Sequence, residues 1–135
     1  MPYQYHDETH IHQLPEDTIF VFGSNLAGKH ECGAALTAYE HFGAMTHFGR
    51  GWAGQSFAIA TANEHQQAMP IHQIAHYIDD FKIYTKNHPQ QTYFVTAVGC
   101  GHVGYDAKDI APLFQGISDN VILPKRFKAY LEEFF

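Results

Sequence analysis

Apolar segments rich in β-branched and aromatic residues recur along the chain, and segments with helical spacing separate them. The run 18–22 (Thr-Ile-Phe-Val-Phe) ends in a Gly-Ser-Asn turn, which predicts a buried strand. Similar runs predict strands over 56–61, 92–98 and 120–123. The residues up to Leu14 can add one further strand at an edge of the sheet.

Helical spacing is clearest in the middle of the chain. One face of a helix over about 70–86 would carry four apolar residues: Ile71, Ile74, Ile78 and Phe81. Pro70 in the first turn is typical of a helix start. Shorter helices are predicted over three other segments: 33–42, 108–114 and 125–135. Pro112 is expected to shorten or bend the second of these.

Strands that alternate with helices and are apolar on both faces are typical of a parallel or mixed sheet covered by helices. The 135 residues are too few for an eight-stranded α/β barrel, which takes about 250. We therefore predict a single α/β domain over 1–135: a three-layer α/β/α sandwich with a mostly parallel or mixed sheet of about four to six strands.

Composition narrows the class of function. Asp and Glu outnumber Lys and Arg by 14 to 8, a net charge of −6 with the 11 histidines counted as neutral. This charge disfavours general nucleic-acid binding, because phosphate contacts require cations. The chain has no apolar run of about 18 residues and no signal-peptide pattern, so we expect a cytoplasmic protein without membrane contact. Two cysteines cannot form a disulfide framework or a four-thiolate zinc site.

Two glycine-rich loops each follow a predicted strand and precede a predicted helix. They span residues 23–33 and 99–106. If the strands are parallel, both loops lie at one edge of the sheet, where ligands bind in such folds. Backbone N–H groups and the positive ends of two helices would then face one cleft, so the sequence predicts an anion site there.

Two nucleotide-binding motifs match this region in part. Residues 23–29 (GxxxxGK) match most of a P-loop, but His30 replaces the Ser or Thr that would bind Mg²⁺. Residues 99–104 (GxGxxG) match the dinucleotide fingerprint, but the next predicted strand, 120–123, has no acid at its end. The same letters at 49–54 precede a strand, which is the wrong context.

The order of these features resembles the macro domain family, whose members bind ADP-ribose. A strand ending at 23–25 (Gly-Ser-Asn) leads into a glycine-rich loop at 28–33 and a helix that begins with small residues. Later, the strand at 92–98 feeds residues 101–105 (Gly-His-Val-Gly-Tyr), which look like the family's Gly-x-x-Gly-aromatic loop around the diphosphate. The resemblance covers roughly residues 18–123.

The resemblance implies that ADP-ribose or a related nucleotide diphosphate binds between the two loops. It also allows hydrolysis of ADP-ribosyl linkages by a water activated near Asn25. The family's adenine-binding Asp has no clear counterpart, because Asp7 and Asp17 are poor matches. The sequence therefore does not indicate which base the ligand carries. The alternatives are a non-catalytic binding or interaction module with a degenerate cleft, and P-loop-like nucleotide binding. No cofactor and no metal is predicted, and no protein partner is indicated.

The resemblance and the loop positions single out the candidate ligand-binding residues: Gly23, Ser24, Asn25, Lys29, Gly33, Ala34, Gly99, Gly101, His102, Val103, Gly104 and Tyr105. Asn25 and His102 are the candidate catalytic residues. Asn25 can instead be a turn residue that bonds its own backbone, and Lys29 can be a solvated lysine rather than a phosphate ligand. Tyr105 either stacks on a ribose or covers the core.

The two cysteines offer a further possibility. Cys32 lies at a predicted helix start, where a thiol pKa can fall, and Cys100 ends a predicted strand. A thiol nucleophile would need a base, for which His30 and His102 are the candidates.

Two histidine pairs have spacings that suit metals. His72 and His76 stand four residues apart on a predicted helix, which can hold zinc but equally suits a solvated polar face. His10 and His12 would point to one side of an edge strand, where adventitious metal binding is the most that we expect.

Overall fold

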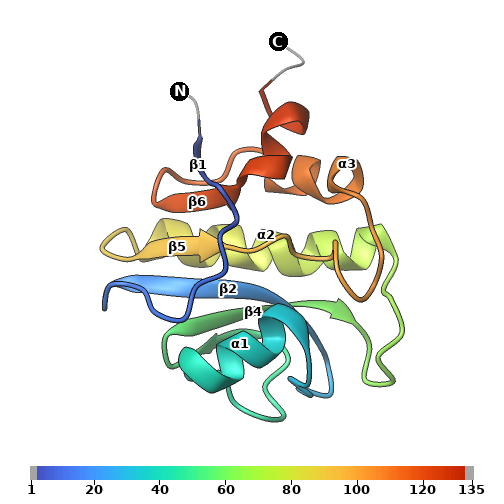
Figure 1. The fold of residues 1–135 in the computed structure, drawn as a ribbon. Helices are drawn as coiled ribbons and strands as arrows, with labels where there is room; N and C mark the ends of the chain where they lie inside the picture. Colours follow the sequence, from blue (N-terminus) through green and yellow to red (C-terminus); the bar gives the residue numbers. More distant parts are fainter. Residues whose placement is uncertain (1–2, 133–135) are drawn as a thin grey trace.

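The computed structural model describes residues 3–132, which fold around one six-stranded sheet (Figure 1). The strands are β1 (Gln4–His6), β2 (Thr18–Asn25), β3 (Gly51–Ala53), β4 (Ser56–Ala62), β5 (Thr92–Val95) and β6 (Val121–Pro124). The α-helices are α1 (Gly33–His41), α2 (Ile71–Asn87) and α3 (Ala107–Ile110). Two 3₁₀ helices complete the fold: η1 (Ala111–Phe114) and η2 (Lys125–Tyr130).

The sheet is mixed, with the strand order β1-β6-β5-β2-β4-β3. Every neighbouring pair is parallel except β3 and β4. The prediction of an α/β fold with a mostly parallel or mixed sheet is therefore confirmed. Because β1, β6, β5, β2 and β4 run in the same direction, the loops that follow them leave from the same edge of the sheet.

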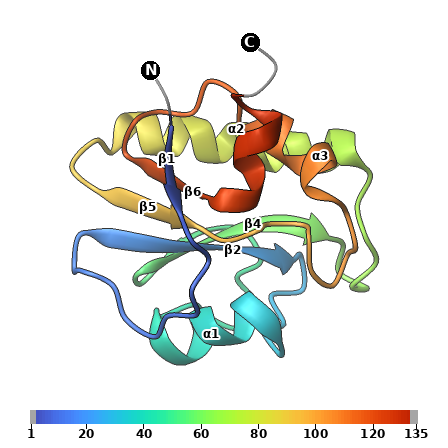
Figure 2. The same cartoon turned by 45° about the horizontal axis from the view of Figure 1, so that its top comes forward.

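Helices lie on both sides of the sheet, and the alternating side chains of β2 show why. Ile19 and Val21 pack into the larger core cluster, which includes the apolar face of α2. Phe20 and Phe22 point the other way and pack against α1. Figure 2 shows α2 and α1 on opposite sides of the strands. The four side chains of β2 are at most 3% exposed, as the continuous apolar run predicts for a strand covered on both faces.

Several element boundaries differ from the predictions. β5 ends at Val95 rather than at residue 98, because the backbone turns: Val98 N–H donates to Thr96 O over 2.7 Å. β2 continues to Asn25 because its last residues still pair with β4. The three-residue edge strand β3, which pairs antiparallel with β4, was not predicted. It is too short and too glycine-rich to show a period of two.

The two C-terminal helices are shorter and tighter than predicted. The helix expected over 108–114 is one α-turn, α3, which becomes the 3₁₀ helix η1 where Pro112 removes a backbone donor. The helix expected over 125–135 is the 3₁₀ helix η2, which ends at Tyr130, and residues 133–135 lie outside the described range. Within residues 3–132, none of the helices has the length and apolar character needed to cross a membrane.

Candidate functional site

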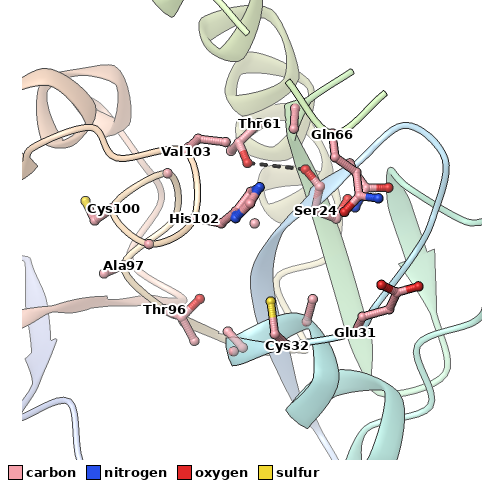
Figure 3. A pocket seen from close by; sticks show the side chains of 18 of the residues that line it. Ser24, Glu31, Cys32, Thr61, Gln66, Thr96, Ala97, Cys100, His102 and Val103 are labelled. Carbon is pink, nitrogen blue, oxygen red and sulfur yellow. Dashed lines mark hydrogen bonds between the residues drawn. The ribbon is translucent and has the colours of Figure 1, made fainter. Parts of the chain in front are cut away.

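The loops after β2 and β5 converge on one cleft of about 440 Å³ (Figure 3). They meet because β2 and β5 are parallel neighbours in the sheet. The volume lies within the range of about 300–1,000 Å³ typical of small-molecule sites. Of the candidate ligand-binding residues, the cleft is lined by Gly23, Ser24, Asn25, Lys29, Gly33, Ala34, Gly99, Gly101, His102 and Val103.

The start of helix α1 forms one wall of this cleft. Cys32 is the N-cap residue, and its side chain makes no capping hydrogen bond. The first turn carries no acidic residue, and Gly33, Ala34 and Ala35 all line the cleft. Because these side chains are small and the first N–H groups of a helix have no partner within the helix, the positive end of α1 is open to an anion.

The loop after β5 forms the facing wall. Gly104 N–H donates to Gly101 O over 3.0 Å, and Tyr105 N–H donates to Gly99 O over 2.9 Å, so the loop is closed by its own backbone. The N–H groups of Gly101, His102 and Val103 have no acceptor within residues 3–132. Three successive unpaired N–H groups beside a cleft form a cradle for an anion.

Gly99 is required by the fold. Its φ is +77°, and a Cβ there would lie 2.9 Å from Ile110 Cδ1. Gly101 differs, because its φ lies outside the left-handed region and a Cβ would meet no atom within 4 Å. A side chain at residue 101 would therefore leave the fold intact and take up room in the cleft.

Gly104 and Tyr105 do not line the cleft. The Tyr105 ring packs against the larger core cluster, and its hydroxyl donates to Met69 O in the segment before α2. The tyrosine therefore holds the end of the loop to the core, which is the second of its two predicted roles.

Asn25 lines the cleft, but the loop's own backbone holds its amide. Nδ2 donates to Lys29 O over 3.0 Å, and Oδ1 accepts from Lys29 N–H over 3.1 Å. This is the geometry of the turn interpretation. A ligand contact by Asn25 would have to use the remaining proton of Nδ2 or the remaining lone pair of Oδ1.

Buried contacts hold the first loop from below. The Ser24 hydroxyl donates to Gly49 O, and Thr61 Oγ1 donates to Ser24 O over 3.2 Å. His30 is only 6% exposed, its Nε2 lies 2.9 Å from Met45 O, and it lines no part of the cleft. The loop after β2 is therefore anchored to residues 45–49.

The expectation that two open helix ends face the cleft is half correct. At α3, Asp106 and Asp109 form a capping box, which places the helix's own carboxylates at the N–H groups of the N-cap and N3 residues. Of these two helix starts, that of α1 is the one without an acidic side chain at its cap or in its first turn.

Sequence reasoning missed several residues that line the cleft: Glu31, Ala35, Thr61, Ala62, Gln66, Thr96, Ala97 and Arg126. Arg126 was predictable in principle, because it follows β6 closely and the carboxyl end of β6 lies at the same sheet edge. Thr61 and Ala62 likewise end β4. Gln66 lies between β4 and α2, where no local signal points to the cleft.

Both cysteines line the cleft, as the convergence of the loops requires. The Cys32 side chain is exposed and that of Cys100 is partly buried. Desolvation raises the pKa of the Cys100 thiol above its ordinary value, and the thiol lies 3.7 Å from Val98 O. A raised pKa keeps Cys100 protonated near neutral pH, so it is not an activated nucleophile.

Among the histidines, His102 is placed for chemistry on a bound ligand. It is exposed, and Figure 3 shows its ring pointing into the cleft, with Glu31 at another part of the rim. His76 faces Asp80 at 4.0 Å on the exposed side of α2. In residues 3–132, no group of three or more His, Cys, Asp or Glu side chains is placed to hold a metal ion.

A second cleft of about 540 Å³ adjoins the first. The two share five lining residues: Gly33, Ala34, Thr96, Ala97 and Arg126. Arg126 Nε lies 2.6 Å from Glu8 Oε1, so a cation fixed by the segment after β1 stands at the junction. On the sheet side, the His6 ring stacks on Phe94 with a centroid distance of 3.9 Å.

The two acids considered for adenine recognition lie elsewhere. Asp17 precedes β2, and its carbonyl pairs with Thr92 N–H at the opposite edge of the sheet. Asp7 follows β1, but it lines neither cleft, and its carboxylate accepts from both the N–H and the hydroxyl of Thr9.

Comparisons of the chain with protein-family models, curated proteins and solved structures found no match. The two clefts and the chemistry of their walls are therefore the basis for a functional assignment. Fold alone does not determine function, whereas the groups that line a site limit what it can bind.

Proposed function

We propose that this protein binds ADP-ribose or a related nucleoside diphosphate, with the diphosphate in the first cleft. One observation carries the proposal: the N–H groups of residues 101–103 and the open N-terminus of α1 lie on opposite walls of the same cleft. Backbone donors on two sides suit a doubly charged bridging group better than a single carboxylate.

The overall charge of −6 does not oppose such a ligand. Lys29 and Arg126 line the cleft beside one acid, Glu31, and the backbone dipoles act at contact distance. Acids elsewhere on the surface are screened over about 8–10 Å at physiological salt.

The second cleft supplies the place for the nucleoside half of the ligand in this proposal. It shares the α1 wall with the first cleft and has aromatic side chains, Phe20 and Phe94, on its sheet side. A macro-like, three-layer arrangement, with α1 and α2 on opposite sides of the sheet, belongs to the same proposal.

One geometrical feature disfavours the P-loop interpretation, and another disfavours a catalytic role for Asn25. In a P-loop the lysine enters the first helical turn, whereas here α1 begins at Gly33, four residues after Lys29.

Hydrolysis is the second candidate function, because His102 and Glu31 line the first cleft. Asn25, the other catalytic candidate, is held by the backbone of Lys29.

Calorimetry with ADP-ribose, NAD, ATP and GTP in parallel tests the proposal. We expect ADP-ribose to bind and Gly101→Val to weaken its affinity by about tenfold or more, because the added side chain takes up room beside the N–H cradle. Gln73→Val, on the exposed side of α2 and away from both clefts, is the matched control. No binding of any diphosphate would overturn the proposal, and Mg²⁺-dependent preference for ATP would restore the P-loop reading.

Incubation with a mono-ADP-ribosylated protein tests the second candidate. Release of ADP-ribose that His102→Ala abolishes would establish hydrolysis with His102 in the mechanism. Tight binding without release would leave a binding module.

A further inference from the structure

Histidines are concentrated in the second cleft. Of the 11 in the chain, four line it: His6, His10, His12 and His41. They come from β1, from the segment that follows it, and from the last turn of α1. Protonated imidazole donates from both ring nitrogens, so this lining suits an anionic group.

The His12 ring contacts two of the other imidazoles, those of His10 and His41. The His10 and His12 ring centroids lie 4.7 Å apart, and those of His12 and His41 lie 4.6 Å apart. All three side chains are exposed. Imidazole is the side chain that gains charge between about pH 8 and pH 6, and rings this close would repel one another once protonated unless an anion lay between or beside them.

His6 has a different role. Its ring stacks on Phe94, Nε2 lies 2.6 Å from Val95 O, and Nδ1 accepts from Glu8 N–H over 3.1 Å. Burial lowers the pKa of His6 below its ordinary value, which favours the neutral ring.

Arg126 adds a permanent charge that is already oriented. Glu8 Oε1 accepts from the Nε–H of the Arg126 side chain over 2.6 Å, and Glu8 Oε2 accepts from the backbone N–H of Arg126 over 3.3 Å. The terminal amino groups of the guanidinium have no partner within residues 3–132. A guanidinium held by its Nε presents its remaining N–H groups to a phosphate in fixed geometry.

The acids of the cleft determine the sign of the pH effect. Glu8 is paired with Arg126, and Glu40 of α1 is the other acid that lines the cleft. With neutral imidazoles the lining carries Arg126 against these two carboxylates, a net charge of 1 − 2 = −1. Any imidazolium formed in this lining adds positive charge and so favours an anion.

We propose that the second cleft binds a phosphate monoester on the base-bearing ribose, so that the preferred ligand is a nucleotide with a phosphate beyond its 5′-phosphate or diphosphate. The inference rests on the proposed function, because the nucleoside must enter the second cleft. It goes beyond the proposed function because the first cleft by itself would not distinguish nucleotides that carry this further phosphate from those that lack it.

The test uses adenosine 2′,5′-bisphosphate and adenosine 3′,5′-bisphosphate against AMP at about pH 8 and pH 6, with ADP-ribose as a separate ligand, by calorimetry. We expect at least one bisphosphate to bind about tenfold more tightly than AMP at the lower pH, and the preference to shrink at the higher pH. Protonation of the added phosphate, whose second pKa is about 6, acts in the opposite direction because it lowers the ligand's charge.

Variants separate the two sources of charge. Arg126→Gln should reduce the preference at both pH values, whereas His12→Gln and His41→Gln should reduce only its gain at the lower pH. His72→Gln, on α2 and outside both clefts, should change neither. His12 and His41 are exposed, so their replacement does not threaten the core.

The outcomes distinguish the two proposals. Equal affinities for AMP and both bisphosphates at both pH values, with ADP-ribose bound, would overturn the second-cleft inference alone. A preference that His12→Gln and Arg126→Gln leave intact would also overturn it. Failure of ADP-ribose to bind would overturn the proposed function, and a bisphosphate preference in that case would show that the second cleft acts without it.

Discussion

The loops after β2 and β5 border the same cleft but are held in different ways. Side chains hold the first: Asn25 clamps Lys29, Ser24 bonds Gly49, and His30 reaches Met45. Backbone bonds hold the second, from Gly104 to Gly101 and from Tyr105 to Gly99. The second loop can therefore offer free N–H groups with few side chains in the way, whereas the first contributes the open end of α1.

The largest difference in unfolding free energy should be between Gly49→Ala, which affects the first loop, and Gly101→Ala in the second loop. At Gly49 a Cβ would lie 2.0 Å from Asn25 O, a backbone atom that cannot move without displacing the first loop. We expect Gly49→Ala to cost about 3 kcal/mol or more of unfolding free energy. Gly101→Ala, where a Cβ meets nothing within 4 Å, should stay within about 0.5 kcal/mol of the native protein. Urea unfolding of the two variants checks this, and equal stabilities would contradict the comparison.

Removal of the Asn25 clamp should have the next largest effect. Asn25→Ala loses two hydrogen bonds in a largely buried position, so we expect a loss of about 2 kcal/mol. Asn25→Asp keeps the acceptor for Lys29 N–H but turns a carboxylate oxygen toward Lys29 O, and it should recover only part of the loss. Full stability of the alanine variant would show that the clamp does not hold the first loop.

A smaller effect is expected where the second loop joins α3. Asp106→Ala removes the capping box and should cost about 1 kcal/mol, whereas Asp106→Asn keeps a capping oxygen and should cost less. Thermal unfolding of the two variants measures the difference. Identical unfolding temperatures would mean that Tyr105 and the core alone hold the end of this loop.

The smallest expected contrast concerns the thiols, one at each loop. Burial raises the pKa of Cys100, so at a given pH a smaller fraction is thiolate, and it should alkylate more slowly than the exposed Cys32. The Cys100 rate should keep rising as the pH increases through the ordinary thiol range near about 8.5. Mass spectrometry after iodoacetamide treatment, with Cys32→Ser and Cys100→Ser as references, measures each rate, and faster labelling of Cys100 would contradict its burial.

Local patterns were sufficient for most of the secondary structure. The apolar run of β2 and the helical repeat of α2 appear in the structure within a few residues of their predicted limits, because each depends on neighbours in sequence. β3 was missed, and so was the early end of β5. β3 depends on its pairing with β4, which no local pattern records, and β5 ends where the backbone turns between Thr96 and Val98.

The sequence by itself determined the order of the helices and of the strands other than β3, the two glycine-rich loops, and ten of the residues that line the first cleft. The three-dimensional structure decided between roles that the sequence left open: Asn25 bonds the backbone of Lys29, and Tyr105 turns to the core and donates to Met69 O. It also joined Arg126 to Glu8 across 118 residues and gathered His10, His12 and His41. The physical reason is that periodicity and turn chemistry act over a few residues, whereas the partner of a polar side chain depends on which strands become neighbours in the sheet.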